Sequence, residues 1–269
     1  MRSVPTLRVL ALGLLVALMF AGCGDDDDDD TGDTGTETTV ATPPPFAYKG
    51  KRGPTFWSKL APGYVECNRG KSQSPVDLAD GKPSTQSLEV SYAPGKTEML
   101  HNGHTVEAEV PEGSTITLDG VEYELLQFHY HAPGEHTIGG KRYPLEFHFV
   151  NEAEDGTKAV LGVMATEGTE NPAFSAILAS LPQQKDEMAE VDDVEPADLL
   201  EANPDSDVRW FYQGSLTTPP CTEGVQWTVF NEPIELSADQ IGGFAAVTDN
   251  NSRPLQPLNG TELLLIEPD

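Results

Sequence analysis

Two segments of the chain alternate between polar and apolar residues, and this period of two constrains each of them to a half-buried β-strand. In residues 123–131 the alternation places His129 and His131 on one face of the strand. In residues 145–150 it places His148 opposite a face made only of leucine and phenylalanine. If the two strands are neighbours, three imidazoles converge above a sheet whose reverse side is apolar.

Three converging imidazoles are the ligands of a catalytic zinc site, which keeps one coordination position open. A single histidine in a strand is more often an ordinary structural residue, and a His-x-His pair alone does not separate the two interpretations. Here Gln127 and Glu146 each lie two residues before a histidine on the same face, where their oxygens can accept its second ring N–H. These matching acceptors favour a Zn²⁺ site at His129, His131 and His148.

The same residues resemble the signature blocks of the α-class carbonic anhydrases. The matching blocks, which occur in the expected order, are Gln-Phe-His-Tyr-His-Ala-Pro-Gly-Glu-His (127–136), Glu-Phe-His-Phe-Val (146–150), Gly-Ser-Leu-Thr-Thr-Pro-Pro-Cys (214–221), Ser-Gln-Ser-Pro-Val (72–76), Asn-Gly-His (102–104) and Arg-Pro-Leu-Gln-Pro-Leu (253–258). The resemblance runs from about Phe46 to the C-terminus and is to an exported bacterial member of the family. It implies a mainly β fold with a central twisted, mostly antiparallel sheet of about ten strands and a few short helices.

Strand and helix patterns favour the same architecture without reference to the family. Short strand-like runs separated by Gly, Pro and Asn cover 88–92, 104–110, 114–118, 121–131, 143–151, 158–166, 207–213 and 224–230. One helix is expected between Asn171, which can cap it, and Pro182, which stops it. Ser237 with Gln240 resembles a capping box that opens a second short helix.

The resemblance implies reversible hydration of carbon dioxide to bicarbonate and a proton by zinc-bound hydroxide. In the family, a threonine hydroxyl accepts the hydroxide proton and donates its own to a buried glutamate, and Thr217 and Glu135 occupy those positions. Thr218 would contact bicarbonate. His104 matches the histidine that passes protons to buffer, a role for which imidazole titrates in the right range.

Carbon dioxide is apolar and needs a dry wall beside the metal. Val150 lies two residues after His148 and so shares its face, which makes it a pocket residue on the strand pattern alone. Val160, Leu216 and Trp227 fall at the other pocket positions that the resemblance implies.

The resemblance also assigns supporting roles. Asn251 would offer its backbone carbonyl to His131, with its side chain incidental, and Tyr48 would border the zinc-bound solvent. His136 is expected to support its loop through hydrogen bonds. His101 has no counterpart in the family blocks, and we expect it to be an exposed strand residue.

The N-terminus indicates export. Residues 1–22 are typical of a signal peptide, with a basic start and an apolar run over 9–20 that is too short for a membrane-spanning helix. Cys23 follows Phe-Ala-Gly, which resembles a bacterial lipoprotein cleavage box, so we expect a lipid there; the alternative is an ordinary secreted protein. Residues 23–45, with six consecutive aspartates and a Thr/Pro-rich stretch, then form a disordered tether.

Residues 46–269 form one domain, with 14 lysines and arginines against 36 aspartates and glutamates. This balance makes nucleic-acid binding very unfavourable. Cys67 and Cys221 fall where many exported α-class enzymes carry a disulfide, and two free thiols are the alternative. We therefore expect a protein anchored by lipid and facing the periplasm or cell exterior, or else secreted, whose partner is a small-molecule substrate.

Two other functions are compatible with the same fold. One is a catalytically inactive, metal-free binding module, but such relatives typically lose a ligand histidine, and all three are present here. The other is a zinc esterase, against which the small apolar pocket argues. The sequence does not indicate an oligomeric state.

Overall fold

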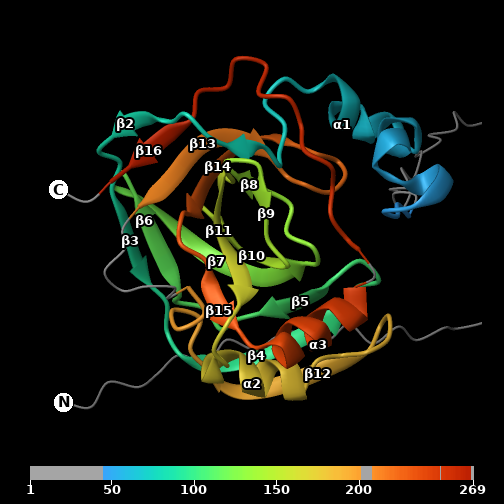
Figure 1. The fold of residues 1–269 in the computed structure, drawn as a ribbon, viewed down its shortest axis with the longest axis vertical. Coiled ribbons are helices and arrows are strands. Elements are labelled where there is room, and N and C mark those ends of the chain that lie inside the picture. The colour runs from blue at the N-terminus through green and yellow to red at the C-terminus, as the bar shows by residue number, and fades with distance from the viewer. Residues whose placement is uncertain (1–44, 201–207, 249, 268–269) are drawn as a thin grey trace, which may run out of the picture. The chain divides into compact units, whose positions relative to one another are not determined.

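The computed structural model describes residues 45–200, 208–248 and 250–267 (Figure 1). The predicted signal peptide, Cys23 and the tether as far as residue 44 lie outside the described residues, and those predictions stay predictions. Among the helices that are described, none has the length and apolar composition needed to cross a membrane.

One large sheet dominates the described residues, and its main path runs through ten strands. In spatial order these are β12 (Met188–Val194), β4 (Gly95–His101), β5 (Val106–Glu109), β7 (Val121–His131), β10 (Leu145–Glu152), β11 (Lys158–Glu167), β14 (Glu223–Phe230), β13 (Arg209–Ser215), β16 (Leu264–Ile266) and β2 (Lys82–Ser84). Strands β3 (Leu88–Ser91), β6 (Thr115–Leu118) and β15 (Ile234–Leu236) branch from this path. A small sheet contains β1 (Asp77–Leu78), β8 (Thr137–Ile138) and β9 (Lys141–Arg142).

Most strand pairs are antiparallel, and the parallel pairs of the large sheet are β11 with β14, β11 with β15, and β16 with β2. The predicted mainly β fold is therefore confirmed. The eight predicted strand runs coincide with β3, β5, β6, β7, β10, β11, β13 and β14. The predicted runs do not include the longer strands β4 and β12 or the short strands β1, β2, β8, β9, β15 and β16. In β4 the inward positions carry Thr97, Met99 and His101 rather than branched apolar residues.

Two helices cover the apolar side of the central strands. α2 (Pro172–Ala179) and α3 (Ala238–Thr248) lie side by side at the lower edge of Figure 1. Phe147 of β10 packs between them, with its ring centroid 4.8 Å from that of Phe174 and 5.5 Å from that of Phe244. Burial of these three rings holds the helices against the sheet, and replacing one by alanine would cost about 3–5 kcal/mol.

Both predicted helix caps are present. The Asn171 side chain accepts a hydrogen bond from the Ala173 amide at 3.0 Å, which satisfies one of the free donors at the start of α2. At α3 the Gln240 amide donates to the Ser237 hydroxyl at 3.2 Å, and the Ser237 amide donates to the Gln240 side chain at 3.1 Å. This reciprocal pair is a capping box.

Residues 45–71, which we call the N-terminal arm, contain the short helices η1 (Gly50–Arg52), η2 (Pro54–Lys59), η3 (Pro62–Tyr64) and α1 (Glu66–Arg69). The arm folds around Trp57, which is fully buried and donates its indole N–H to the carbonyls of Ala47 and Arg52 at 2.9 and 3.0 Å. The Cys67–Cys221 disulfide, which is present as predicted, joins the arm to the loop after β13.

Candidate metal centre and cavity

The register between β7 and β10 brings the three predicted ligand histidines together. His148 is opposite His129, and Glu146 is opposite His131, in an antiparallel pair whose opposed side chains share a face. The ring centroid of His129 is 5.2 Å from that of His131 and 5.3 Å from that of His148. The centroids of His131 and His148 are 4.7 Å apart. One nitrogen from each ring lies within 4.8 Å of the other two.

Each of these imidazoles uses its other nitrogen in a hydrogen bond to a fixed acceptor. The ring nitrogen and the acceptor oxygen are 2.8 Å apart in every pair: His129 Nδ1 with Gln127 Oε1, His131 Nδ1 with the Asn251 carbonyl, and His148 Nε2 with Glu146 Oε1. An acceptor at one nitrogen requires the proton to be there, so the opposite nitrogen keeps its lone pair. The three remaining nitrogens face one another.

This donor set fits a zinc ion. His131 Nε2 is buried and has no hydrogen-bond partner among the described residues, a costly state that a metal would relieve. Burial is the main cause that lowers the pKa of all three rings, well below the usual value for His129 and to about 4 for His131. The imidazoles are therefore neutral near pH 7, and neutral imidazole is the form that binds metal.

Glu146 fixes both a ligand and the following loop. Besides His148, its carboxylate accepts hydrogen bonds from the backbone amides of Glu135 and His136, at 2.6 and 2.8 Å. It also lies 2.6 Å from His136 Nδ1. Burial alone would raise the pKa of Glu146, but His136 and His148 outweigh it and hold this pKa well below its usual value. Because His136 Nε2 also lies 2.6 Å from the Tyr212 hydroxyl, His136 supports the loop through hydrogen bonds, as predicted.

Glu135 and Thr217 lie together beside this cluster, and both are buried. Glu135 Oε1 accepts the Arg253 amide at 2.7 Å and lies 3.5 Å from His131 Nδ1. Burial raises the pKa of Glu135 to about 7, and the Thr217 hydroxyl is among the groups that act in the opposite direction. Within the described residues, Glu135 Oε2 makes no hydrogen bond of normal geometry.

A cavity of about 420 Å³ opens above the histidines. All the predicted substrate-binding residues line it together with His129, His148 and Thr217: Val150, Val160, Leu216, Thr218 and Trp227. The charged residues Glu107, Glu109 and Lys158 also line it, and the sequence analysis did not single them out. Strand alternation could have indicated Glu107, since it lies opposite His129 in the pairing of β5 with β7.

His104 lies outside this cavity, in a separate hollow of about 300 Å³ that Phe46, Tyr48 and Arg52 also line. Its ring stacks on that of Phe46, with centroids 3.8 Å apart and planes 10° from parallel. The Tyr48 ring is 6.3 Å from it. Burial, followed by the positive charge of Arg52, lowers the pKa of His104. His104 and Tyr48 therefore line the hollow beside the N-terminal arm and not the cavity above the histidine cluster.

Two expectations about single residues are wrong. The Asn251 side chain is not incidental, because its oxygen accepts the Ala132 amide at 2.8 Å and its nitrogen donates to the Tyr130 carbonyl at 3.0 Å. His101 is buried rather than exposed, with 7% of its surface accessible. Because β4 lies between β12 and β5, alternate residues of β4 point into the core, and His101 is one of them.

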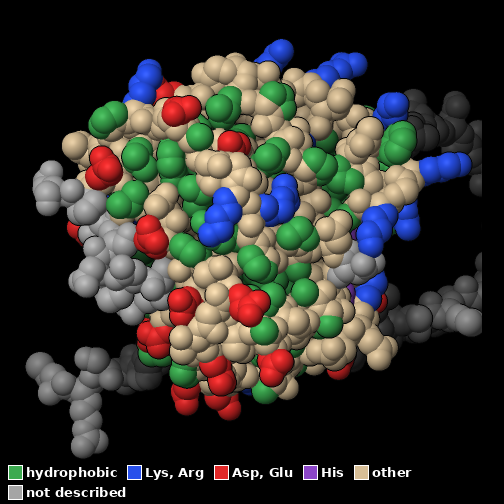
Figure 2. Space-filling model, in the orientation of Figure 1, with side chains coloured by type: hydrophobic (Ala, Val, Ile, Leu, Met, Phe, Trp, Pro, Cys, Tyr) green, Lys and Arg blue, Asp and Glu red, His purple; other side chains and the backbone are tan. Residues whose placement is uncertain are grey.

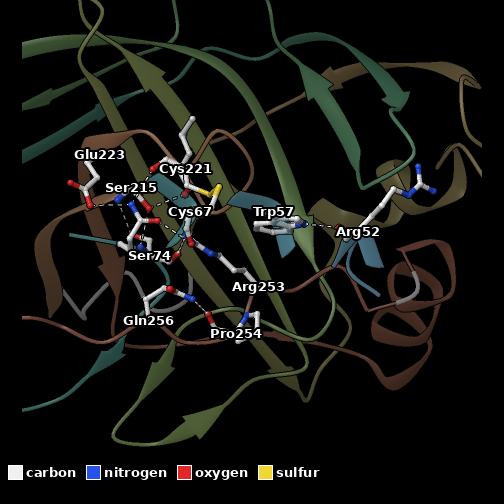
Figure 3. Close-up of a disulfide and its surroundings, with 12 residues drawn as sticks. Arg52, Trp57, Cys67, Ser74, Ser215, Cys221, Glu223, Arg253, Pro254 and Gln256 are labelled. Atoms are coloured by element: carbon white, nitrogen blue, oxygen red, sulfur yellow. Dashed lines mark hydrogen bonds between the residues drawn. A yellow bond between two sulfur atoms is a disulfide. The ribbon is translucent and has the colours of Figure 1, made fainter. Parts of the chain in front are cut away.

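A buried arginine that the sequence analysis did not identify as a site residue connects the disulfide to this site (Figure 3). Arg253 donates from its guanidinium to the carbonyls of Ser74 and Cys67, at 2.6 and 3.0 Å, and to the Gln73 side chain at 2.8 Å. Gln73 in turn donates to the Cys221 carbonyl at 3.1 Å. The chain segment that supports His131 and Glu135 is therefore fixed to both halves of the disulfide.

Comparison with known proteins gives one consistent result. Residues 52–265 match the eukaryotic-type carbonic anhydrase family. The carbonic anhydrase of Pectobacterium atrosepticum is 38% identical over 218 residues, which cover 80% of this chain and 88% of that protein. That of Klebsiella pneumoniae is 38% identical over 219 residues, with the same coverage of both chains. The solved structure of the alpha-carbonic anhydrase from Thermovibrio ammonificans with the inhibitor sulfanilamide superposes with a TM-score of 0.78, at 39% identity over 81% of this chain and 98% of that one.

Proposed function

The chain belongs to the eukaryotic-type carbonic anhydrase family, and we propose that it hydrates carbon dioxide to bicarbonate with a zinc ion held by His129, His131 and His148. One observation carries this proposal: three neutral imidazoles, each with one nitrogen fixed by an acceptor, turn their free nitrogens toward a common point. Neutral ligands add no negative charge, so a divalent ion at this point keeps its full charge. When bound, zinc supplies a Lewis acid that makes water acidic near neutral pH, the property for which carbonic anhydrase is the standard example.

Thr217 and Glu135 orient the attacking water. When Glu135 is ionised, its carboxylate can only accept hydrogen bonds, so the Thr217 hydroxyl then donates its single hydrogen bond to it. The oxygen of Thr217 is then free to accept a hydrogen bond from the attacking oxygen, whose lone pair is left pointing into the cavity. Threonine fits this role because one hydroxyl both donates and accepts.

The apolar wall positions the substrate. The apolar part of the cavity lining beside His129 includes Val150, Val160, Leu216 and Trp227. These side chains suit carbon dioxide because it is apolar and needs no hydrogen-bond partner. Thr218 lines the same cavity and can donate a hydrogen bond to the bicarbonate product. The wall also keeps competing water away from the reacting carbon.

His104 carries the released proton to buffer. Its lowered pKa keeps it neutral and able to accept a proton at neutral pH. Its ring is half-buried against Phe46 but borders a hollow at the surface, which gives buffer a route to it.

Stopped-flow measurement of carbon dioxide hydration tests the proposal. The purified, zinc-loaded protein should accelerate hydration, and a chelator that removes the metal should abolish the acceleration. Hydrolysis of esters without carbon dioxide hydration would instead indicate a zinc esterase, and activity toward neither would indicate a binding module.

The disulfide fits an exported protein, because such bonds persist in oxidising compartments. We propose export with a lipid on Cys23. Mass spectrometry of membrane-extracted protein tests the lipid, and an unmodified cysteine would exclude it.

A further inference from the structure

Positive charge is concentrated at one end of an otherwise acidic domain. The N-terminal arm (45–71) contains six lysines and arginines and a single acidic residue, Glu66. From residue 72 to the C-terminus there are eight lysines and arginines against 35 aspartates and glutamates. The arm is therefore strongly basic, although the chain as a whole carries a formal charge of −28.

The basic residues of the arm lie on the surface as one group. All six are exposed: Lys49, Lys51, Arg52, Lys59, Arg69 and Lys71. The short helices of the arm contact one another, so the arm that carries these side chains is compact. In Figure 2 lysine and arginine side chains gather along the right-hand edge, over the arm, whereas acidic side chains gather at the lower left.

Ion pairing separates the arm from the rest of the domain. Four of the five lysines between residue 72 and the C-terminus each pair with a carboxylate, and the fifth, Lys141, lies over the Tyr143 ring. The pairs are Lys82 with Glu262, Lys96 with Glu190, Lys158 with Glu152, and Lys185 with Asp186. In the arm, by contrast, five cations make no ion pair with any described residue: Lys51, Arg52, Lys59, Arg69 and Lys71. A cation without a local partner is available to an external anion.

The arm also presents an aromatic ring among its charges. Phe56 is 39% exposed, and the Lys59 ammonium group lies 5.7 Å from the centre of its ring. An exposed aromatic residue next to basic side chains on one surface is typical of segments that lie at a membrane interface. Along the chain, the arm begins 22 residues after Cys23, the predicted lipid attachment site, a separation that a flexible linker spans at roughly 26 Å.

We propose that the N-terminal arm is a docking surface for an anionic phospholipid membrane. Each basic residue near such a surface increases partitioning by about fivefold, and clusters of four to eight are typical of lipid-binding segments. The acidic remainder of the domain is repelled by the same surface, so the two effects together turn the arm toward the membrane. This inference does not depend on the proposed catalytic function, and it adds a protein contact to any lipid anchor.

Co-sedimentation of the full chain with vesicles tests the proposal. The measured quantity is the ratio of binding to phosphatidylglycerol-containing vesicles over binding to pure phosphatidylcholine vesicles. A leader or lipid contributes to both, so the ratio isolates the charge effect. The unmodified protein should give a high ratio at low salt that falls toward one at 1 M salt, where the Debye length is about 3 Å.

Two variants with the same net charge make the test specific. The arm variant carries Lys51→Gln, Arg52→Gln, Lys59→Gln, Arg69→Gln and Lys71→Gln, and its ratio should fall by at least about 100-fold. The control carries Lys82→Gln, Lys96→Gln, Lys141→Gln, Lys158→Gln and Lys185→Gln and should keep most of the ratio. If the arm variant does not fold, Lys51→Gln with Arg52→Gln alone should lower the ratio by about 25-fold.

Three outcomes would overturn the proposal. A ratio near one for the unmodified protein would show that the arm has no preference for anionic lipid. Equal losses in the arm variant and the control would show that only total charge matters. Binding that appears only after Asp25–Asp30 are all changed to asparagine would show that the arm's partner is the chain's own acidic run.

Discussion

The histidine cluster and the region around His104 are supported in different ways. His129, His131 and His148 lie on two central strands, and each has a fixed hydrogen-bond acceptor. His104 lies in a turn between strands, and its ring is held by stacking on Phe46, a residue of the arm. The histidine cluster is therefore fixed by several rigid neighbours, whereas the proposed proton route depends on the ring contacts of His104 with Phe46 and Tyr48.

The largest effect should come from removing a ligand of the cluster. His131→Ala should abolish zinc retention and activity together, because the remaining two imidazoles cannot complete the site. His101→Ala is the matched control, since it removes another buried histidine of the same sheet that lies outside the cluster. Mass spectrometry measures the zinc content of both variants, and an assay of carbon dioxide hydration measures their activity. An unchanged zinc content in His131→Ala would exclude His131 as a ligand.

Removing an acceptor should weaken the cluster without destroying it. Gln127→Ala leaves His129 Nδ1 without its partner at 2.8 Å, so the ring can rotate and change tautomer. We expect zinc affinity to fall by about 10- to 100-fold. Competition with a chelator measures the affinity, and an unchanged value would mean that the strand alone fixes the ring.

On the proton route, a single substitution should have a smaller effect that depends on buffer. His104→Ala should lower turnover by about tenfold or more in weak buffer, since proton transfer then becomes limiting. Added imidazole should restore the rate, while zinc content stays unchanged. An equal loss in every buffer would show that His104 supports the structure and does not carry protons to buffer.

The smallest effect concerns the pKa of His104. Arg52→Gln removes a positive charge that lowers this pKa, so the pKa should rise toward its usual value. As pH falls, the neutral, proton-accepting form is then lost at a higher pH than in the unmodified protein. NMR titration of the imidazole resonances measures the shift. Lys82→Gln, which removes a charge that does not act on His104, should leave the pKa unchanged, and a fall in Arg52→Gln would contradict the assignment.

The sequence predicted most of the sheet, most of the apolar residues and the proposed metal ligands around the cavity, but not the charged residues Glu107, Glu109 and Lys158 that also line it. The period of two on 123–131 and 145–150 was sufficient to place three histidines on matching faces, and the family blocks supplied Glu135 and Thr217. It missed β4, whose inward residues include Met99 and His101, and β12, whose buried Val191 and Val194 are separated by two aspartates at a register shift and so break the period of two. The family blocks also gave no sign that His104 would stack on Phe46, because stacking depends on where the arm lies.

What the sequence determined by itself is local: alternation along two strands, the caps of two helices, and the unequal distribution of charge between the arm and the rest of the domain. Only the tertiary structure decided which distant groups meet. Asn251 is 120 residues from the histidine that it orients, a contact that the family resemblance predicted but no local pattern could, and Arg253 is 186 residues from the cysteine carbonyl to which it donates. No local rule of backbone geometry relates residues so far apart, and their contact follows from how the whole sheet folds.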